Sequence, residues 1–290
     1  MTNESAHSRT TTLTPPTTDG VTVRRVKTLA EYQECVAIQH ETWGESFGEL
    51  VPAAILMVSQ RLSGVCAAAF APGGRMLGFV FGMTGTMDGS LVHWSDLLAV
   101  RPEARGRGLG ERLKRYQRDL VRAVGVKTMY WTFDPLVARN AHLNLERLGA
   151  RAVEYVPDMY GSFTGSPLHG TLPTDRFVAK WDLTAEERIG EERAPRPPVA
   201  GVVVNPPASG AVSALPGFPD ADVVRVVIPR DFEALEEEER ATWRAVTRQA
   251  FQVYLARGYH VAGFRRGSDA GLPYYELARA HSAPRSGKPR

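Results

Sequence analysis

The sequence predicts an α/β protein, and three observations indicate this class. Over residues 21–183, short apolar or alternating runs typical of strands take turns with apolar residues spaced three and four apart, which are typical of helices. Within this region a strand, a glycine-rich turn and a helix follow one another directly over residues 97–114. A shorter strand, helix, strand, strand succession occupies residues 223–277. With 290 residues, 43% of them hydrophobic and 23% charged, the chain can bury a sizeable core.

The first half of the main region is predicted to contain one strand, two helices and then three strands. In chain order we expect a strand at 21–26, helices at 29–43 and 52–62, and strands at 65–70, 76–83 and 91–100. Pro52 suits the first turn of its helix, because its missing N–H would be unpaired there in any case. The turn Ala-Pro-Gly-Gly at 71–74 joins two of the strands into a hairpin.

The second half of the main region begins at the glycine-rich turn. We expect a helix at 109–124, a strand at 126–133, a helix at 137–148, and strands at 150–156 and 176–183. Gly149 stands where a left-handed residue commonly ends a helix.

The composition changes on both sides of the main region, which we place at 21–184. Residues 1–20 are polar with a Pro-Pro pair and are predicted to be a disordered tail. The proline-rich residues 185–221 are predicted to be a linker, residues 222–280 a C-terminal α/β extension, and residues 281–290 a second disordered tail. Within the extension we expect a strand at 223–229, a long helix at 232–257, and strands at 259–264 and 274–277.

The composition also argues against several classes of function. A net charge of +3 is too small to indicate a nucleic-acid partner for the whole chain. The two cysteines, Cys35 and Cys66, make no disulfide framework, and neither they nor the histidines have a ligand spacing, so no metal is expected. Because the sequence has no 18-residue apolar span and no signal-peptide core, we expect a soluble, cytoplasmic protein that does not bind membranes.

The strongest functional signal is the stretch from Leu97 to Lys114. Pro102 ends the strand because it cannot donate to a ladder, and three glycines then allow a tight turn. The bare N–H groups of such a turn and the positive end of the next helix dipole favour an anion such as a pyrophosphate, although glycine can also serve sterically. For the basic residues of that helix, a solvated face is favoured over contact with nucleic acid: Arg112, Lys114, Arg115, Arg118 and Arg122.

Two motifs resemble a known family. The turn lacks the spacing of a Rossmann fingerprint and the Gly-Lys-Ser/Thr of a Walker loop. Arg105-x-x-Gly108-x-Gly110, preceded by Val100-x-Pro102-Glu103, instead resembles the acetyl-CoA signature of the GNAT (Gcn5-related N-acetyltransferase) family. A second region, with Asn140-Ala141 followed by Glu-Arg-Leu-Gly-Ala at 146–150, is similar to another motif of this family.

The resemblance implies a GNAT fold over residues 21–184. This is a mixed, mostly antiparallel sheet flanked by helices, in which the glycine-turn strand splays from its parallel neighbour and leaves a V-shaped slot. The extension at 222–280 repeats the order of elements of the second half and resembles a degenerate half-GNAT unit. We expect it to pack beside the main sheet or against a second subunit in a homodimer, with a plain α/β extension as the alternative.

The resemblance also implies a reaction. The acyl group of acetyl-CoA or another acyl-CoA would pass directly to a primary amine of a small molecule, with amino acids among the candidates. The turn and its two arginines would bind the pyrophosphate of CoA, and the strand before it would pair with the pantetheine arm. The cofactor-binding residues implied in this way are Leu98, Ala99, Val100, Arg105, Gly106, Arg107, Gly108, Leu109, Gly110 and Asn140.

The proton-transfer residues match the family less well. We favour Asp96 over His93 as the general base, because in a regular strand Asp96 shares a face with Leu98 and Val100; a partner role for a nearby arginine is the alternative. The family's frequent tyrosine acid falls at Leu145, which cannot transfer a proton. Tyr160 and His142 are the other candidates, and the CoA thiolate can also leave without an acid.

Other readings of the chain remain open at this point. A catalytically silent CoA-binding or interaction module is favoured by the missing tyrosine and the long extension. Succinyl-CoA or a related acyl-CoA is an alternative donor, protein acetylation is a further variant, and DNA binding ranks third.

Overall fold

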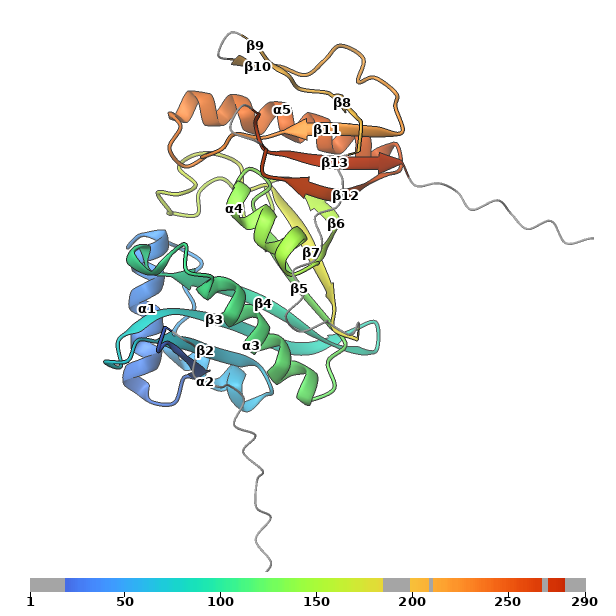
Figure 1. Ribbon diagram of the computed structural model, residues 1–290. Coiled ribbons are helices and arrows are strands. Elements are labelled where there is room, and N and C mark those ends of the chain that lie inside the picture. The colour runs from blue at the N-terminus through green and yellow to red at the C-terminus, as the bar shows by residue number, and fades with distance from the viewer. Residues whose placement is uncertain (1–18, 185–198, 209–210, 268–270, 280–290) are drawn as a thin grey trace, which may run out of the picture.

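The computed structural model describes residues 19–184, 199–208, 211–267 and 271–279. The tail predicted at 281–290 lies outside the described residues, as do most of the tail at 1–20 and parts of the linker at 185–221. The described residues form a seven-stranded sheet, a four-stranded sheet and a two-stranded pair, and the four-stranded sheet lies above the seven-stranded sheet in Figure 1. Within these ranges, no helix combines the length and apolar character needed to cross a membrane.

The seven-stranded sheet holds most of the predicted elements of residues 21–184. Its strand order is β1-β2-β3-β4-β5-β7-β6, and every neighbouring pair is antiparallel except β4 and β5. The prediction of a mixed, mostly antiparallel sheet is therefore confirmed. The elements are β1 (Thr22–Arg25), α1 (Leu29–Trp43), α2 (Ala53–Arg61), β2 (Val65–Phe70), β3 (Met76–Met87), β4 (Ser90–Val100), η1 (Pro102–Ala104), α3 (Leu109–Ala123), β5 (Thr128–Phe133), α4 (Ala138–Ala141), η2 (His142–Arg147), β6 (Arg151–Val156) and β7 (Arg176–Asp182).

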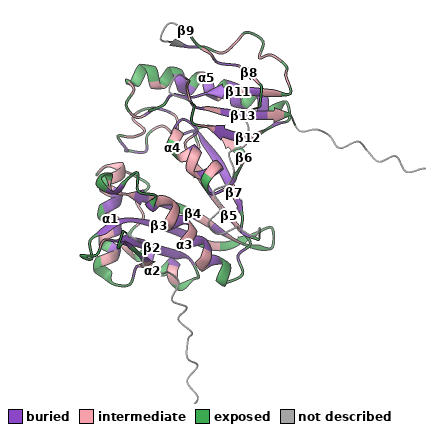
Figure 2. Ribbon diagram, in the orientation of Figure 1, coloured by how far each residue is buried: buried purple, intermediate pink, exposed green. Residues whose placement is uncertain are grey.

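Two apolar clusters cover the two faces of this sheet. One joins α3 and the residues of α4 and η2 to the sheet, for example through Leu113, Leu145 and Trp131. The other joins α1 and α2 to the opposite face, for example through Ile38 and Leu56. Because side chains alternate along a strand, the strands contribute to both clusters, and Figure 2 shows their long buried runs.

The two parallel strands separate part-way along their length. β4 and β5 pair from Val92 with Thr128 to Trp94 with Tyr130, and no later pair is formed. Both strands continue beyond this point, β4 to Val100 and β5 to Phe133. The predicted splay of the glycine-turn strand from its parallel neighbour is therefore confirmed.

The helix predicted at 137–148 differs from the structure in its winding. Its first turn is α4, and η2 is π-helical, with Leu148 N–H donating to the Leu143 carbonyl five residues back at 2.9 Å. Asn144 in this segment is buried and its amide oxygen accepts a hydrogen bond from the Trp131 indole at 3.1 Å. Such π-helical turns commonly lie at functional sites.

The second sheet repeats the topology of the second half of the first. In β11-α5-β12-β13 the last strand lies between the other two and is antiparallel to both, as β7 is between β5 and β6. Three short strands, β8 to β10, lie within the predicted linker. The elements are β8 (Val202–Val203), β9 (Pro207–Ala208), β10 (Ala211–Val212), β11 (Val223–Val227), α5 (Glu237–Ala256), β12 (Tyr259–Arg265) and β13 (Tyr274–Arg279).

The long helix of the extension begins later than predicted. α5 starts at Glu237 rather than at Phe232. Phe232 is instead a buried anchor of the preceding loop, with the Arg244 guanidinium 5.1 Å from its ring centroid. The expectation of a helix from Phe232 is wrong because its apolar side chain serves this loop contact and not the first helical turn.

The extension shares one apolar core with the first sheet. Phe177 of β7 packs against Phe251 of α5 with ring centroids 4.9 Å apart, and against Tyr275 of β13 at 5.5 Å. The Tyr275 hydroxyl donates to the Pro135 carbonyl at 2.7 Å. The extension thus packs beside the main sheet, at the end where β5 stops.

Candidate functional site

The turn after β4 exposes unpaired backbone donors. Gly106 and Gly108 are left-handed, with φ of 75° and 71°, and Gly108 is the N-cap of α3. No atom lies within 4 Å of a Cβ built on either, so the backbone conformation and not packing requires glycine there. Among the described residues, none accepts a hydrogen bond from the N–H groups of residues 106–110. Together with the dipole of α3, free N–H donors in this arrangement favour an anion.

Arginine side chains hold the turn in place. Arg105 Nε donates to the Val100 carbonyl at 3.1 Å, which folds the turn back onto the end of β4. Arg101 forms ion pairs with Glu34 and Glu41 of α1. Arg107 is exposed, so its guanidinium lies at the surface beside the turn.

The free edge of β4 leads from the strand separation to the turn. The Arg101 N–H donates to the Leu77 carbonyl of β3 at 2.9 Å. Because the backbone groups of successive residues point to opposite edges of a strand, the N–H and carbonyl groups of Leu98 and Val100 point away from β3. The backbone groups of Ala99 point toward β3. Because the Val100 carbonyl already accepts from Arg105, the N–H groups of Leu98 and Val100 and the Leu98 carbonyl are the groups that this edge offers to an extended ligand arm.

A β-bulge lies where this free edge begins. Gly82 of β3 pairs with Ser95, but the preceding residue Phe81 pairs with Leu97, so Asp96 is the extra residue. A Cβ at Gly82 would overlap with buried atoms of β4 and α3, so only glycine fits opposite the bulge. Bulges redirect side chains and are common beside active sites.

The bulge changes the face on which Asp96 lies. Ser95 hydrogen-bonds to side chains of α3, and Leu98 lies beside the start of α3, so both residues are on the α3 face. Asp96 lies on the opposite face, near Glu49 of the loop between α1 and α2. The expectation that Asp96 shares the face of Leu98 and Val100 is wrong, because it assumed a regular strand.

Asp96 is an accessible carboxylate at the strand separation. The residue is exposed, but packing around the carboxyl group partly desolvates it, and this desolvation, followed by the negative charge of Glu49, raises the pKa of Asp96. A hydrogen bond from Trp94 acts in the opposite direction. A carboxylate with a raised pKa at this point can accept the proton of an incoming ammonium group.

His93 lies inside the core. It is fully buried between Thr84, 2.9 Å from its Nδ1, and Gln117 of α3, 3.0 Å from its Nε2. Burial, helped by the positive charge of Lys114, lowers the pKa of His93 to about 3. In this position the imidazole is neutral, and its burial keeps it away from an amine substrate. Of the two candidates for the general base, the geometry therefore favours Asp96.

Tyr160 lies across the separation from Asp96. Its hydroxyl is 3.0 Å from Thr132 Oγ1, and Thr132 stands two residues beyond the last β4–β5 pair, as Asp96 does on β4. The loop that carries Tyr160, residues 157–175, also bonds to the α1–α2 loop, with Gly48 N–H donating to the Thr164 carbonyl at 2.8 Å. The structure thus brings Tyr160 and Asp96 to the same face of the sheet.

The remaining candidates lie in and around α4. Asn140 is half-buried in α4, and no described group hydrogen-bonds to its amide. Leu145 is buried in the core, and His142 of η2 is partly buried, with a pKa lowered first by burial.

The sheet combines the strand separation with the turn of free N–H donors at residues 106–110, which we call the donor turn and which follows the same strand, β4. The strand separation and this turn are the two features that the resemblance to the GNAT family implies for the sheet. The chain matches no protein-family model and no curated protein.

Several solved acetyltransferase structures are similar to the chain. YncA of Salmonella typhimurium, in complex with its cofactor acetyl-CoA, is 18% identical with a TM-score of 0.45, covering 60% of this chain and 98% of its own. Aminoglycoside 6'-acetyltransferase type Ii is 17% identical with a TM-score of 0.45, covering 57% and 99%. The ribosomal-protein-S18-alanine N-acetyltransferase of Escherichia coli is 15% identical with a TM-score of 0.43, covering 58% and 97%. Similarity at this level carries no information on the acceptor.

Sequence reasoning missed a buried lysine beside the seven-stranded sheet. Lys114 was assigned to a solvated helix face, but it is 2% exposed. Its Nζ donates to Ser95 Oγ at 2.8 Å and lies 3.8 Å from the Trp131 ring centroid. Burial holds the pKa of Lys114 well below its ordinary range. Because Ser95 and Trp131 are the first residues beyond the last β4–β5 pair, Lys114 marks the point where the strands part.

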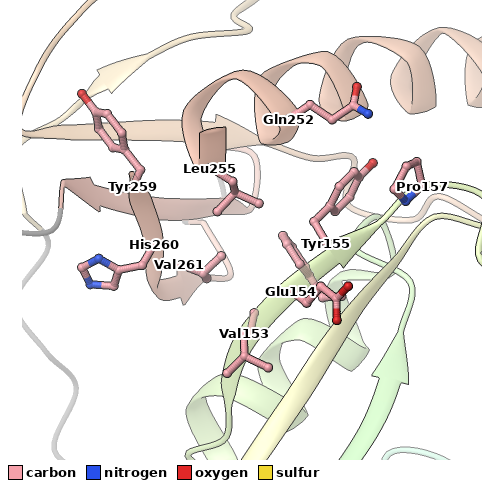
Figure 3. Close-up of a pocket in the computed structure, with 11 residues that line it drawn as sticks. Val153, Glu154, Tyr155, Pro157, Gln252, Leu255, Tyr259, His260 and Val261 are labelled. Atoms are coloured by element: carbon pink, nitrogen blue, oxygen red, sulfur yellow. The ribbon is translucent and has the colours of Figure 1, made fainter. Parts of the chain in front are cut away.

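A surface pocket of about 380 Å³ lies elsewhere, between the two sheets. Figure 3 shows its lining side chains from β6, α5 and β12, including Tyr155, Leu255 and Val261. None of the predicted site residues lines it. The pocket is a gap between the edge strands of the two sheets and is separate from the donor turn.

Proposed function

We propose that the chain is a GNAT-type, acyl-CoA-dependent N-acyltransferase that acts on the primary amine of a small molecule, with amino acids among its acceptors. The observation that supports this best is the continuous path from the β4 bulge, along the unpaired edge of β4, to the donor turn. About 17 Å of strand separates Ser95 from Val100, enough for an extended arm to run along it. An acyl-CoA bound in this way has its pyrophosphate at the turn and its thioester at the bulge.

The chemistry proposed for this path needs few side chains. The amine attacks the thioester carbon, the tetrahedral intermediate collapses, and the CoA thiolate leaves. An N–H group of the β4 edge, such as that of Leu98, stabilises the oxyanion. Asp96 takes the ammonium proton directly or through water, and Tyr160 is the candidate donor to the thiolate.

A second function is favoured by a specific observation. Leu145 is buried and occupies the position of the family's frequent acid, which suits a module that binds CoA without catalysis. Succinyl-CoA is an alternative acyl donor, because it would bind along the same backbone path as acetyl-CoA.

The test combines binding with turnover. Calorimetry measures CoA binding, and mass spectrometry follows products from a mixed pool of amines with acetyl-CoA or succinyl-CoA. The enzyme is expected to give amine-dependent release of CoA and a new amide. Tight CoA binding without any amide product would favour the silent module, and no CoA binding would reject both readings.

A further inference from the structure

We infer that the acceptor carries a carboxylate beside its amine, as an amino acid does, and that Arg176 binds this carboxylate. The inference rests on the proposed function, because it assigns the acceptor of that same site. It is carried by a buried guanidinium that has no carboxylate of its own. This guanidinium lies on the face of the sheet that bears Asp96 and Tyr160, which we call the acceptor face.

Arg176 lies on the same face of the sheet as Asp96. In the parallel pair, His93 is opposite Met129 and lies on the α3 face, so Tyr130 and Thr132 lie on the other face. Thr132 is opposite Val178 of β7, and side chains two residues apart share a face, which places Arg176 there too. The Arg176 guanidinium lies 5.5 Å from the ring centroid of Tyr160, which bonds to Thr132.

The charges around Arg176 do not balance. Three guanidinium groups, of Arg176, Arg244 and Arg248, meet only two carboxylates, of Asp134 and Asp175, in this cluster of described residues. Arg244 bonds to both oxygens of Asp134, at 3.0 and 2.6 Å. Arg248 bonds to both oxygens of Asp175. Each carboxylate therefore already has a bidentate arginine partner.

Arg176 itself is left with weaker partners. Its side chain is 9% exposed, and its nearest carboxylate oxygen, on Asp134, is 3.6 Å away. It donates to the backbone carbonyl of Asp175 at 3.0 Å and to His169 Nε2 at 3.0 Å. Burial is the main cause that lowers the pKa of Arg176. Arg176 thus shares Asp134 with Arg244 and contacts it only at 3.6 Å, and a buried cation with so distant an anionic partner can take a closer anion.

The neighbours of Arg176 fix its position. Burial, followed by the positive charge of Arg176, lowers the pKa of His169 to about 4, so the imidazole is neutral and accepts through Nε2. Its Nδ1 therefore donates to Thr164 Oγ1, 2.7 Å away. The Thr164 carbonyl in turn accepts from Gly48 of the α1–α2 loop. A chain of hydrogen bonds thus connects the guanidinium to the loop that carries Glu49.

The two sides of the acceptor face have opposite charge. Asp96 and Glu49 lie on the β4 side, and Arg176 lies two strands away on β7. From the strand spacing and the register, the Cα atoms of Asp96 and Arg176 are about 12 Å or more apart. The two side chains lie on the same face of the sheet, so a small molecule with an ammonium and a carboxylate group can bridge them. A simple amine would leave Arg176 with only the 3.6 Å contact to Asp134 as an anionic partner.

A carboxylate could also come from the acyl donor, as in succinyl-CoA. The donor turn leads into α3, so the head of CoA reaches the sheet from the side of α3. Arg176 lies on the opposite face, which favours the acceptor as the source. The experiment separates the two sources.

The experiment compares Arg176→Gln with Lys180→Gln in the full chain. Lys180 lies on the same strand and face as Arg176 but level with Tyr130, within the paired part of β4 and β5, so its removal is a matched loss of charge. The twenty standard amino acids are screened with acetyl-CoA, and the best acceptor is compared with its carboxamide. We expect kcat/KM to favour the acid by at least about a hundredfold in the unmodified protein and in Lys180→Gln. In Arg176→Gln the preference is expected to fall to near one, mainly through KM for the acid, and Arg176→Lys should restore part of it.

Each other outcome has a defined meaning. Turnover of the acid and the carboxamide at equal rates, unchanged by Arg176→Gln, would overturn the inference and leave the proposed function intact. An Arg176 dependence seen with succinyl-CoA and simple amines would assign the carboxylate to the donor and overturn it too. If no amino acid is turned over, calorimetry measures the binding of an amino acid and of its carboxamide to the CoA-saturated protein. Binding that requires the carboxylate and is lost in Arg176→Gln supports the inference. Binding that does not depend on the carboxylate, or the absence of binding, refutes it. Circular dichroism and thermal unfolding confirm that each variant is folded.

Discussion

At the scale of single residues, the proposed catalysis depends on two carboxylates near the strand separation. Asp96 is exposed on a bulge and has Glu49 near it, so its raised pKa has two physical causes. A base is active when ionised, so kcat/KM should fall as the pH falls through this raised pKa. The buried imidazole of His93 cannot produce the same limb from inside the core.

Replacing Asp96 by asparagine tests this role. We expect Asp96→Asn to lower kcat/KM by about a hundredfold or more near neutral pH and to remove the acidic limb of the pH profile. Asp88→Asn, in the turn between β3 and β4, is the matched control and should leave the profile unchanged. A retained acidic limb in Asp96→Asn would show that another group is the base.

The buried histidines predict how stability depends on pH. His93 and His169 have folded pKa values lowered to about 3 and about 4, whereas an unfolded histidine titrates near 6.5. As the pH falls below about 6.5 the unfolded chain binds protons first, so the free energy of unfolding decreases, and for His93 this continues to about pH 3. The slope from His93 is at most about 1.4 kcal/mol per pH unit.

Urea unfolding between pH 7 and pH 4 measures this slope. His93→Gln keeps hydrogen-bonding groups but cannot titrate, so its stability should depend less on pH than that of the unmodified protein. His260→Gln, at an exposed position of β12, should keep the full slope. Equal slopes in all three proteins would contradict the neutral, buried state of His93.

At the scale of elements, the sequence predicted the donor turn and not the bulge before it. The glycines and Pro102 of the turn have local causes that a sequence displays directly. The bulge arises from a register shift between β3 and β4, which depends on the close approach of Gly82 to β4 and α3. A glycine within an apolar strand was the only signal of it, and the face of Asp96 was therefore assigned incorrectly.

The turn can be tested by a pair of glycine substitutions. Gly108 and Gly125 lie at opposite ends of α3, with φ of 71° and 91°, and a Cβ on either has no atom within 4 Å. Alanine at either position should lower the free energy of unfolding by a similar amount, about 1 to 2 kcal/mol. Only Gly108→Ala is expected to weaken CoA binding, by about tenfold or more, because its Cβ stands where the pyrophosphate approaches. Equal CoA affinity in calorimetry of the two variants would argue against the anion site.

At the scale of the whole molecule, the extension is part of the core that supports the site. The sequence predicted its elements and their order, and the repeat of the β5-β7-β6 arrangement in β11-β13-β12 agrees with them. Its junction with the first sheet depends on contacts more than 100 residues apart in sequence, such as Arg244 with Asp134. No local pattern predicts such pairs, and for this reason Arg176 and its cluster were not among the candidate residues.

This junction makes a stability prediction. Arg244→Met leaves the buried Asp134 carboxylate with only the weaker contact to Arg176, so we expect a loss of about 3 kcal/mol in the free energy of unfolding. Arg122→Met, at an exposed position of α3, should change it by less than about 0.5 kcal/mol. Denaturant unfolding of both variants measures the difference, and a similar small effect in both would show that the junction contributes little.

The proposed acyl-CoA lies along the free edge of β4 and at the turn that follows it. Amide hydrogen exchange resolved by NMR, with and without acetyl-CoA, tests this placement most directly. We expect added protection of the N–H groups of Leu98, Val100 and residues 106–110, with little change in β12. Unchanged exchange along β4 and the turn under conditions where acetyl-CoA binds would contradict it.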